Sequence, residues 1–395
     1  MLPMRCKSIL GLWLLFIGMP FGMMSQMLNV HIAPANKIET MTYQALGDEV
    51  VVMTGDSFPR QITTLHTLEK VDIAVTEYGI RLKQNGKNLG HFESLRFWCN
   101  DEKPRFKVYF DRAAISYRTY PDHLRIETGP RYLELTNEVF IETYIKGVIY
   151  AEAGHHKSLD FFKVQALSAR TYALRSLGRH KAHGYDLCDN THCQAFKGEF
   201  SNNPMINQAV DETRGEVIVY NNDQLIEAVF SANCGGFTAN SEDVWVANVN
   251  YLRAVPDYNF CEGFNNHAWH VTVPKLDFLA KLGRYLKVEA TSFEIIPDVS
   301  GRVKRVLVND NGKLSVSGEE VRRLFRLKSS KFHVYDSHSL LFIEGTGFGH
   351  GVGMCQDGAY FLSETGMDYE RILKHYYQGI EIQDIERVNV NFTSR

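Results

Sequence analysis

The sequence carries almost no excess charge of either sign. Its 43 lysines and arginines are balanced by 46 aspartates and glutamates, so the formal net charge at pH 7 is −3. Nucleic-acid-binding domains usually concentrate basic residues in a patch or stripe, and solvating tails concentrate acidic residues. Neither stands out here, and we therefore expect no nucleic-acid partner.

Long apolar segments are also scarce. Residues 8–24, SILGLWLLFIGMPFGMM, form such a segment, but Pro20 interrupts it. A membrane-spanning helix needs about 20 consecutive apolar residues, whereas a shorter stretch behind basic residues, here Arg5 and Lys7, is typical of a secretory signal. We expect a signal peptide over residues 1–25, or an uncleaved N-terminal anchor in its place, and hence export to the periplasm or cell envelope.

Cysteines are few, and they are compatible with an exported chain. Cys6 precedes the apolar segment and is not placed like a lipid-attachment cysteine. Six cysteines follow that segment: Cys99, Cys188, Cys193, Cys234, Cys261 and Cys355. An even number permits disulfides in an oxidising compartment, but the sequence does not give their pairing.

The chain is long enough for one or two domains, and no internal repeat or low-complexity linker divides it. From about residue 27 to 130, short runs rich in Val, Ile, Tyr and Thr alternate with turn residues such as Gly47-Asp48 and Asn85-Gly86. This pattern predicts a sheet of hairpins. We expect a β-rich N-terminal region over residues 26–130.

The pattern then becomes helical. Four residues recur at the spacing of one helix face, namely Ile141, Ile145, Val148 and Glu152. A second helix is predicted to begin near Ser158, a favourable N-cap, and to end at Gly178. Residues 205–385 mix short strands with short helices. We therefore expect an α+β fold, in which residues 131–390 form a mixed catalytic region with a cleft.

Glu152 is the candidate catalytic residue. It continues the apolar stripe of its own helix, where a carboxylate is costly to ionise unless it is paired, so its pKa should be raised. A raised pKa suits a general acid that works near neutral pH. The alternative is a glutamate that ends the helix and faces water. On the next helix, Arg170 is placed to orient a substrate or Glu152, with a surface arginine as the alternative.

A polar loop holds a candidate metal site. Two cysteines and two histidines fall within eleven residues of one another: His183, Cys188, His192 and Cys193. Such a set can bind zinc tetrahedrally, and four protein ligands would make the metal structural because no position stays open. The spacing differs from that of a zinc finger. A Cys188–Cys193 disulfide and a pair of free thiols are the alternatives.

Two glycine-containing loops complete the candidate residues. Residues 345–359, GTGFGHGVGMCQDGA, hold five glycines between 345 and 353, so the backbone can approach a ligand closely. The Gly-Lys-Ser/Thr ending of a phosphate loop is missing. His350 lies at the centre of this loop as a substrate contact or a structural residue. Residues 230–245 carry Ser231 and Cys234, and a Cys234 nucleophile with His350 as its base is a further alternative.

Five blocks, in this order, resemble the stage II sporulation protein D and amidase-enhancer family. They are YIKGVIYAEA (144–153), KVQALSARTYAL (163–174), YDLCDNTHCQAFKG (185–198), SANCGGFTANSEDVW (231–245) and GHGVGMCQDGA (349–359). The resemblance covers about residues 138–385 and is weaker in the N-terminal β region.

The resemblance implies a lytic transglycosylase that acts on peptidoglycan glycan strands, preferably strands stripped of their stem peptides. It gives the acid–base role to Glu152 and favours zinc over a disulfide in the loop of His183, Cys188, His192 and Cys193. It implies that a cleft is lined by candidate substrate contacts, namely Arg170, Tyr172, Ser231, His350 and Gln356. An amidase enhancer, which binds glycan and stimulates a partner amidase without cleaving the glycan itself, is the alternative function.

The chain departs from the family pattern at three places. Ala153-Gly154-His155-His156 replaces a frequent Met-Pro after the glutamate, and Cys234 replaces a common serine. Cys355 replaces the serine of a Ser-Gln-Tyr-Gly-Ala block, in which Asp357 also replaces the tyrosine. These positions border the expected cleft, so the substrate preference is in doubt, whereas Glu152 is retained.

Only one carboxyl is strongly placed for catalysis, because Asp160 and Asp186 lack periodic support. Most glycosidases need two carboxyls. A lytic transglycosylase needs only one: the acid protonates the leaving oxygen, and the muramyl 6-hydroxyl then attacks and returns its proton to the same group. The expected product is a 1,6-anhydromuramyl end.

Overall fold

The structure is a computed structural model that describes residues 26–388, except 34–36, 56–57, 112–116, 155–156, 199–202, 222, 246 and 310. The expected signal peptide over residues 1–25 therefore lies outside the described residues, as do His155 and His156. Within the described ranges, no helix is both long and apolar enough to cross a membrane.

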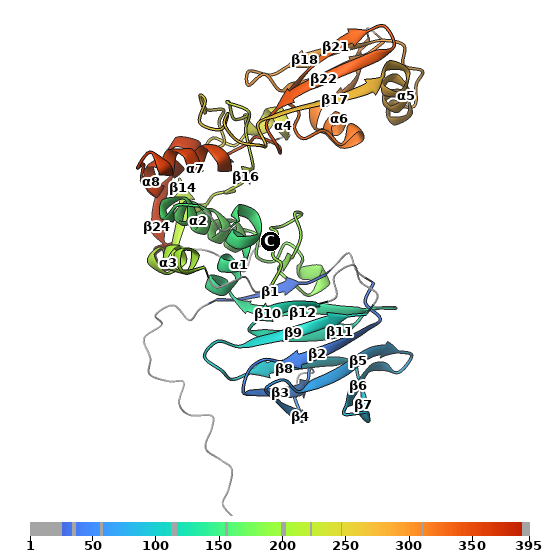
Figure 1. Ribbon diagram of the computed structural model, residues 1–395, viewed down its shortest axis with the longest axis vertical. Coiled ribbons are helices and arrows are strands. Elements are labelled where there is room, and N and C mark those ends of the chain that lie inside the picture. Colours follow the sequence, from blue (N-terminus) through green and yellow to red (C-terminus); the bar gives the residue numbers. More distant parts are fainter. Residues whose placement is uncertain are drawn as a thin grey trace, which may run out of the picture.

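The described residues of the N-terminal part form twelve strands in two packed sheets, at the bottom of Figure 1. Their bounds are β1 (Met27–His31), β2 (Thr40–Ala45), β3 (Glu49–Thr54), β4 (Gln61–His66), β5 (Lys70–Thr76), β6 (Gly79–Gln84), β7 (Lys87–Phe92), β8 (Ser94–Cys99), β9 (Arg105–Phe110), β10 (Tyr117–Pro121), β11 (His123–Thr128) and β12 (Leu133–Phe140). One sheet has the order β13-β1-β12-β11-β8-β3-β4, and the other β10-β9-β2-β5-β6-β7.

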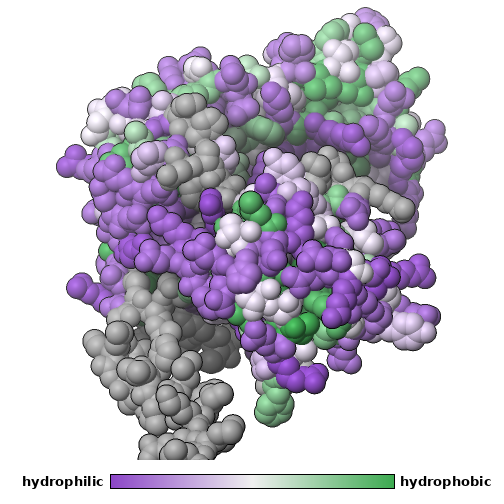
Figure 2. All heavy atoms as spheres, turned by 60° about the horizontal axis from the view of Figure 1, so that its bottom comes forward, coloured by the Kyte–Doolittle hydropathy of each residue, from purple (hydrophilic) through white to green (hydrophobic). Residues whose placement is uncertain are grey.

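Alternating side chains hold these two sheets together. In β3 and β9 every second residue is buried, as expected for strands that have one face on a core. Tyr43 of one sheet stacks on Phe97 of the other, with ring centroids 4.2 Å apart. The described N-terminal region is thus β-rich, and β12 extends its sheet to residue 140. The predicted domain boundary at residue 130 stays a prediction. Figure 2, in which the bottom of Figure 1 comes forward, shows that hydrophilic residues predominate on this face.

A helical layer follows in the middle of Figure 1. Residues 141–244 and 354–387 contribute α1 (Ile141–Ala153), α2 (Leu159–Arg175), η1 (Lys181–His183), β13 (Leu187–Cys188), α3 (Pro204–Glu212), β14 (Glu216–Tyr220), β15 (Gln224–Leu225), β16 (Phe230–Ser231), α4 (Ser241–Val244), β23 (Met354–Cys355), α7 (Gln356–Glu364), α8 (Tyr369–Tyr376), β24 (Glu381–Asp384) and η2 (Ile385–Arg387). Of these, β13 joins the N-terminal sheet, and α4 lies beside the part at the top of Figure 1. Helices α1 and α2 confirm the two predicted helices. The Ser158 hydroxyl caps α2 by accepting a hydrogen bond from the Phe161 amide, and the helix ends at Arg175, before Gly178.

A third part forms the top of Figure 1 and interrupts the helical layer in sequence. It contains β17 (Ala268–Pro274), α5 (Lys275–Leu286), β18 (Phe293–Pro297), β19 (Val303–Val308), β20 (Asn311–Ser317), α6 (Gly318–Phe325), β21 (Phe332–Ser337) and β22 (Leu340–Thr346). The strands form two three-stranded sheets, β17-β22-β21 and β18-β19-β20. Its buried apolar residues form their own cluster around Phe278 and Val306. All three parts together confirm the predicted α+β fold.

Candidate functional site

The site begins with the loop of residues 176–198, which follows α2 and packs against both the N-terminal sheet and helix α1. Strand β13 pairs in parallel with β1, so that Val30 lies opposite Leu187 and His31 opposite Cys188. The carboxylate of Asp189 accepts hydrogen bonds from the Ala33 amide at 2.8 Å and from Nη1 of Arg118 at 3.1 Å. These bonds anchor residues 187–189 to the edge of the sheet.

The same loop then packs against helix α1. The ring of Phe196 is fully buried and lies 4.9 Å from the Tyr144 ring, centroid to centroid. Gly147 allows this approach, because a Cβ there would lie 2.6 Å from the Phe196 ring. The loop is therefore held from two sides, by a strand and by a helix, and its backbone at residues 193–197 has a defined position beside α1.

Glu152 lies in the last turn of α1, next to this loop. The Ala195 amide donates a hydrogen bond of 2.7 Å to its Oε1. Burial raises the pKa of Glu152, while the Ala195 amide and the positive charge of Lys197 oppose that shift. The C-terminal end of a helix carries partial negative charge, which also disfavours an ionised carboxylate. The direction of the shift is the one that the sequence predicted.

The second oxygen of Glu152 is available. No hydrogen bond to Oε2 is formed by any residue that the structure describes, although Oε1 is engaged. Burial and a raised pKa favour the protonated form, and a proton on Oε2 meets no acceptor among the residues that the structure describes. The group can therefore offer its proton to a ligand. Ala195 and Lys197, which set its environment, were not singled out from the sequence, because a backbone amide leaves no pattern there.

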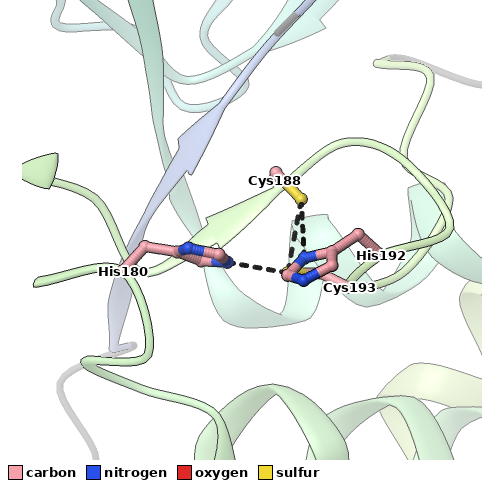
Figure 3. Close-up of side chains that lie close together, drawn as sticks. All are labelled: His180, Cys188, His192 and Cys193. Carbon is pink, nitrogen blue, oxygen red and sulfur yellow. Dashed lines mark hydrogen bonds between the residues drawn. The ribbon is translucent and has the colours of Figure 1, made fainter.

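The candidate metal cluster lies in the same loop and is shown in Figure 3. The donor atoms of His180, Cys188, His192 and Cys193 all lie within 4.8 Å of one another. The two sulfurs are 3.4 Å apart, and Nε2 of His180 is 3.3 Å from Sγ of Cys193. Zinc bonds of about 2.0–2.3 Å at tetrahedral angles place donors roughly 3.3–3.8 Å apart. The donor set and its spacing thus fit zinc.

The structure brings together three of the four predicted ligands and replaces the fourth. His183 belongs to the exposed turn η1, whereas His180 directs its ring at the cysteines. The reason is the stacking of His180 on Tyr185, at 4.8 Å between ring centroids, which fixes Nε2 beside Cys193. The two histidines are three residues apart in the sequence, and only the path of the chain after α2 distinguishes them.

Arg170 lies elsewhere than the prediction placed it. Its guanidinium is 1% exposed and donates two hydrogen bonds to the carboxylate of Glu142, at 3.0 and 2.7 Å. A third hydrogen bond reaches the Glu216 carbonyl. All three nitrogens are thus engaged inside the protein, and the structure gives Arg170 a structural ion pair in place of a substrate contact.

Tyr172 is half-buried near the cysteine–histidine cluster. Its hydroxyl accepts a hydrogen bond of 2.7 Å from Nη1 of Arg179. Burial raises the pKa of Tyr172, and the nearby Cys193 contributes to the shift. The tyrosine is therefore neutral at pH 7 and lies near the cysteine–histidine loop.

The other predicted contacts gather around the strand pair β16–β23. Ser231 lies opposite Cys355 in this pair, and its buried hydroxyl has no hydrogen-bond partner among the described residues. Nδ1 of His350 accepts a hydrogen bond of 3.0 Å from the Val352 amide. Burial lowers the pKa of His350 to about 4, so the ring is neutral at pH 7. Within the described part of the chain, no hydrogen bond or ion pair joins Glu152 to this group.

One side-chain contact links this group to the Glu152 side of the layer. Nε2 of Gln356, the first residue of α7, lies 3.3 Å from Oε1 of Gln165 on α2. Helix α2 starts seven residues after Glu152, and its N-terminal end also meets α8, where Asp160 accepts a hydrogen bond from the Tyr369 amide. Helices α7 and α8 therefore pack on the N-terminal half of α2, the half closer in sequence to Glu152.

The two remaining alternatives from the sequence lose support. Cys234 is completely buried, and its thiol contacts Asp257 and Cys261, so the structure does not pair it with the His350 imidazole. All six described cysteines are free, so the structure contains no Cys188–Cys193 disulfide. Asp160 and Asp186 serve the backbone: Asp160 bonds the Tyr369 amide, and Asp186 bonds the Asn29 amide at 2.9 Å.

Comparison with known proteins defines the class of this α+β chain. The family model of the stage II sporulation protein matches residues 131–220, which hold Glu152 and the cysteine–histidine loop. An uncharacterized protein of Brachyspira hyodysenteriae is 33% identical over 262 residues, which cover 65% of this chain and 70% of that protein.

Two named relatives extend the match. The stage II sporulation protein D of Bacillus amyloliquefaciens is 30% identical over 269 residues, which cover 62% of this chain and 75% of that protein. The amidase enhancer of Bacillus subtilis is 30% identical over 290 residues, which cover 60% of this chain and 39% of that protein. The chain belongs to the stage II sporulation protein D family, as its sequence blocks indicated.

Proposed function

We propose that this chain acts on the cell wall as a lytic transglycosylase that cleaves the glycan strands of peptidoglycan. The observation that carries the proposal is the state of Glu152: a half-buried carboxyl with a raised pKa, held through one oxygen, with no described residue bonded to the other oxygen. Family membership and the relative named amidase enhancer support a role at the cell wall.

In the proposed reaction, Glu152 acts first as an acid. The proton on its free oxygen passes to the glycosidic oxygen as the bond from that oxygen to C1 of the muramyl residue breaks. The muramyl 6-hydroxyl then bonds to C1, and its proton returns to the Glu152 carboxylate. One C–O bond breaks and one forms, no water is consumed, and the enzyme ends in its starting state.

The engagement of both candidate second carboxyls agrees with this reaction. A retaining or inverting glycosidase places a second carboxyl about 5–9.5 Å from the acid. The candidates from the sequence, Asp160 and Asp186, are bound to backbone amides of Tyr369 and Asn29. Because the attacking hydroxyl belongs to the substrate, a single carboxyl is sufficient.

We further propose that His180, Cys188, His192 and Cys193 bind zinc. Four protein ligands leave no open position, so the metal would supply folding energy and no catalytic chemistry. The ligand Cys193 lies two residues before Ala195, whose amide holds Glu152. The zinc loop would thereby position the carboxyl from a distance.

Replacing Glu152 tests the reaction. Glu152→Gln keeps the size and the acceptor for Ala195 but has no carboxyl proton, so release of anhydromuramyl products from denuded glycan should fall by about 10²- to 10⁴-fold. Chromatography of the digest measures those products. Glu49→Gln, an exposed glutamate of β3, is the matched control and should retain full activity. Undiminished release by the Glu152→Gln variant would refute the assignment.

The second candidate function is that of an amidase enhancer, which the name of one relative favours. This chain would then bind glycan without cleaving it and would stimulate a partner cell-wall amidase. Incubating the purified chain alone with denuded glycan separates the two. Anhydromuramyl products without an amidase support the transglycosylase, whereas faster amidase cleavage with no such products supports the enhancer.

A further inference from the structure

A second cluster of metal-binding side chains lies around the strand pair β16–β23. It consists of Cys234, Asp257, Cys261 and Cys355, all four buried, with donor atoms within 4.8 Å of one another. The four residues come from three segments that are separated by up to 121 residues of sequence. Because all four side chains are buried in the packed core, their positions are fixed, and their proximity is not that of mobile surface groups.

The spacing of the donor atoms suits a small tetrahedral ion. Sγ of Cys234 is 3.8 Å from Sγ of Cys261 and 3.2 Å from Oδ2 of Asp257. Donors around a tetrahedral zinc lie roughly 3.3–3.8 Å apart. Three thiolates and a carboxylate form a donor set that selects zinc over magnesium or calcium, which prefer oxygen ligands.

The backbone around the cluster favours thiolates. Sγ of Cys355 accepts hydrogen bonds from the amides of Cys234 at 3.2 Å and Gly358 at 3.4 Å. The second oxygen of Asp257 accepts a hydrogen bond from the Tyr376 hydroxyl. Metal-binding sulfurs and carboxylates are commonly held by such outer hydrogen bonds, which fix their direction.

One buried and one half-buried cation supply a second, independent indication. Arg302 is 1% exposed, and its Nη2 donates a 2.6 Å hydrogen bond to the Cys234 carbonyl, while Nε and Nη1 have no partner among the described residues. Nζ of Lys331 donates to the next carbonyl, that of Gly235, at 2.8 Å. A zinc ion with three thiolates and one carboxylate carries a net charge of about −2. Arg302 and Lys331 balance that charge.

We propose that Cys234, Asp257, Cys261 and Cys355 form a second zinc site, which is structural and lies apart from the cysteine–histidine loop. Cys234 and Cys355 are two of the positions at which this chain departs from the family pattern. The proposed site therefore distinguishes this chain from relatives with serines there. It would join β16, the start of α7 and the loop at residues 257–261, and so fix the glycine loop of His350.

Metal analysis of the purified full chain tests the proposal, and it does not depend on the glycan reaction. We expect about two zinc ions per chain, one for each four-ligand cluster. Cys355→Ser and Asp257→Asn should each lower the content to about one, and so should the double variant Cys188→Ser/Cys193→Ser, which removes the other site. Cys99→Ser, a buried cysteine of β8 outside both clusters, is the control and should leave it at two.

Thiol counting distinguishes the proposed zinc site from a competing disulfide. Denaturing the wild-type chain in chelator without reductant should make every cysteine react with a thiol reagent. A Cys234–Cys261 disulfide would leave two cysteines unreactive and lower the intact mass by two hydrogens, and this would overturn the proposal. If the variants do not fold, cobalt-loaded wild-type protein replaces them: sulfur-to-cobalt absorption from five thiolates supports two sites, whereas absorption from two thiolates overturns the second.

Discussion

Single residues determine how the Glu152 site is protonated. Burial raises the pKa of Glu152, whereas the Ala195 amide and the charge of Lys197 act to lower it. The sequence predicted this direction because Glu152 continues an apolar helix face. It did not predict which neighbours set the pKa, since Ala195 and Lys197 reach Glu152 through a loop 43 residues later.

Under the proposed reaction, Lys197→Ala should shift the pH dependence of glycan cleavage. An acid must be protonated to act, so activity falls as the pH rises through the pKa of Glu152. Lys197 favours the ionised form, and its removal should raise that pKa and move the basic limb of the pH–rate profile to higher pH. Rates of anhydromuramyl release across pH measure the limb. Lys37→Ala, in the N-terminal region, is the control, and a limb that stays in place or moves to lower pH would contradict the expectation.

At the scale of helices and strands, residue patterns predicted some elements and missed others. Helices α1 and α2 follow from apolar spacing and the Ser158 cap. The sequence did not predict helix α7, because it begins at Gln356 directly after a glycine-rich loop. Its N-cap is the Cys355 thiol, which accepts a hydrogen bond from the Gly358 amide. The role of Arg170 was also hidden, since its partner Glu142 lies on another helix, 28 residues away.

Arg170→Leu tests the packing of α1 against α2. Removing the guanidinium leaves the buried Glu142 carboxylate without its partner, so the free energy of unfolding should fall by about 3–5 kcal/mol. Denaturant titration measures the loss. The double variant Arg170→Leu/Glu142→Leu should recover much of it, because both charges are then absent. A stable Arg170→Leu variant that binds glycan poorly would instead restore Arg170 as a substrate contact.

The described part of the molecule has two separate apolar cores. The larger runs from the N-terminal sheets through the helical layer, and the smaller lies within residues 268–346. The sequence predicted short strands and helices there but treated residues 131–390 as one region. Nothing in local periodicity distinguishes a strand that joins one core from a strand that joins another.

Phe278→Ala tests whether the smaller core is independent. This ring is completely buried and stacks on Phe325, with centroids 4.5 Å apart. Its removal should cost about 3–5 kcal/mol within that core. Hydrogen exchange should then speed up at amides of β17 to β22, while amides of β1 to β12 keep their protection. Equal acceleration in both parts would mean that the two cores unfold together.

The pairing of β1 with β13 has a consequence for the order of events during biosynthesis. Asn29 and Asp186 meet although 157 residues separate them, and contacts over such distances form late. A chain that is threaded through a membrane with its N-terminus leading delivers β1 long before the proposed zinc ligands at 188–193 arrive. Metal capture would then be confined to the compartment in which the protein finishes folding, and the metal supply of that compartment would limit how much competent protein is produced.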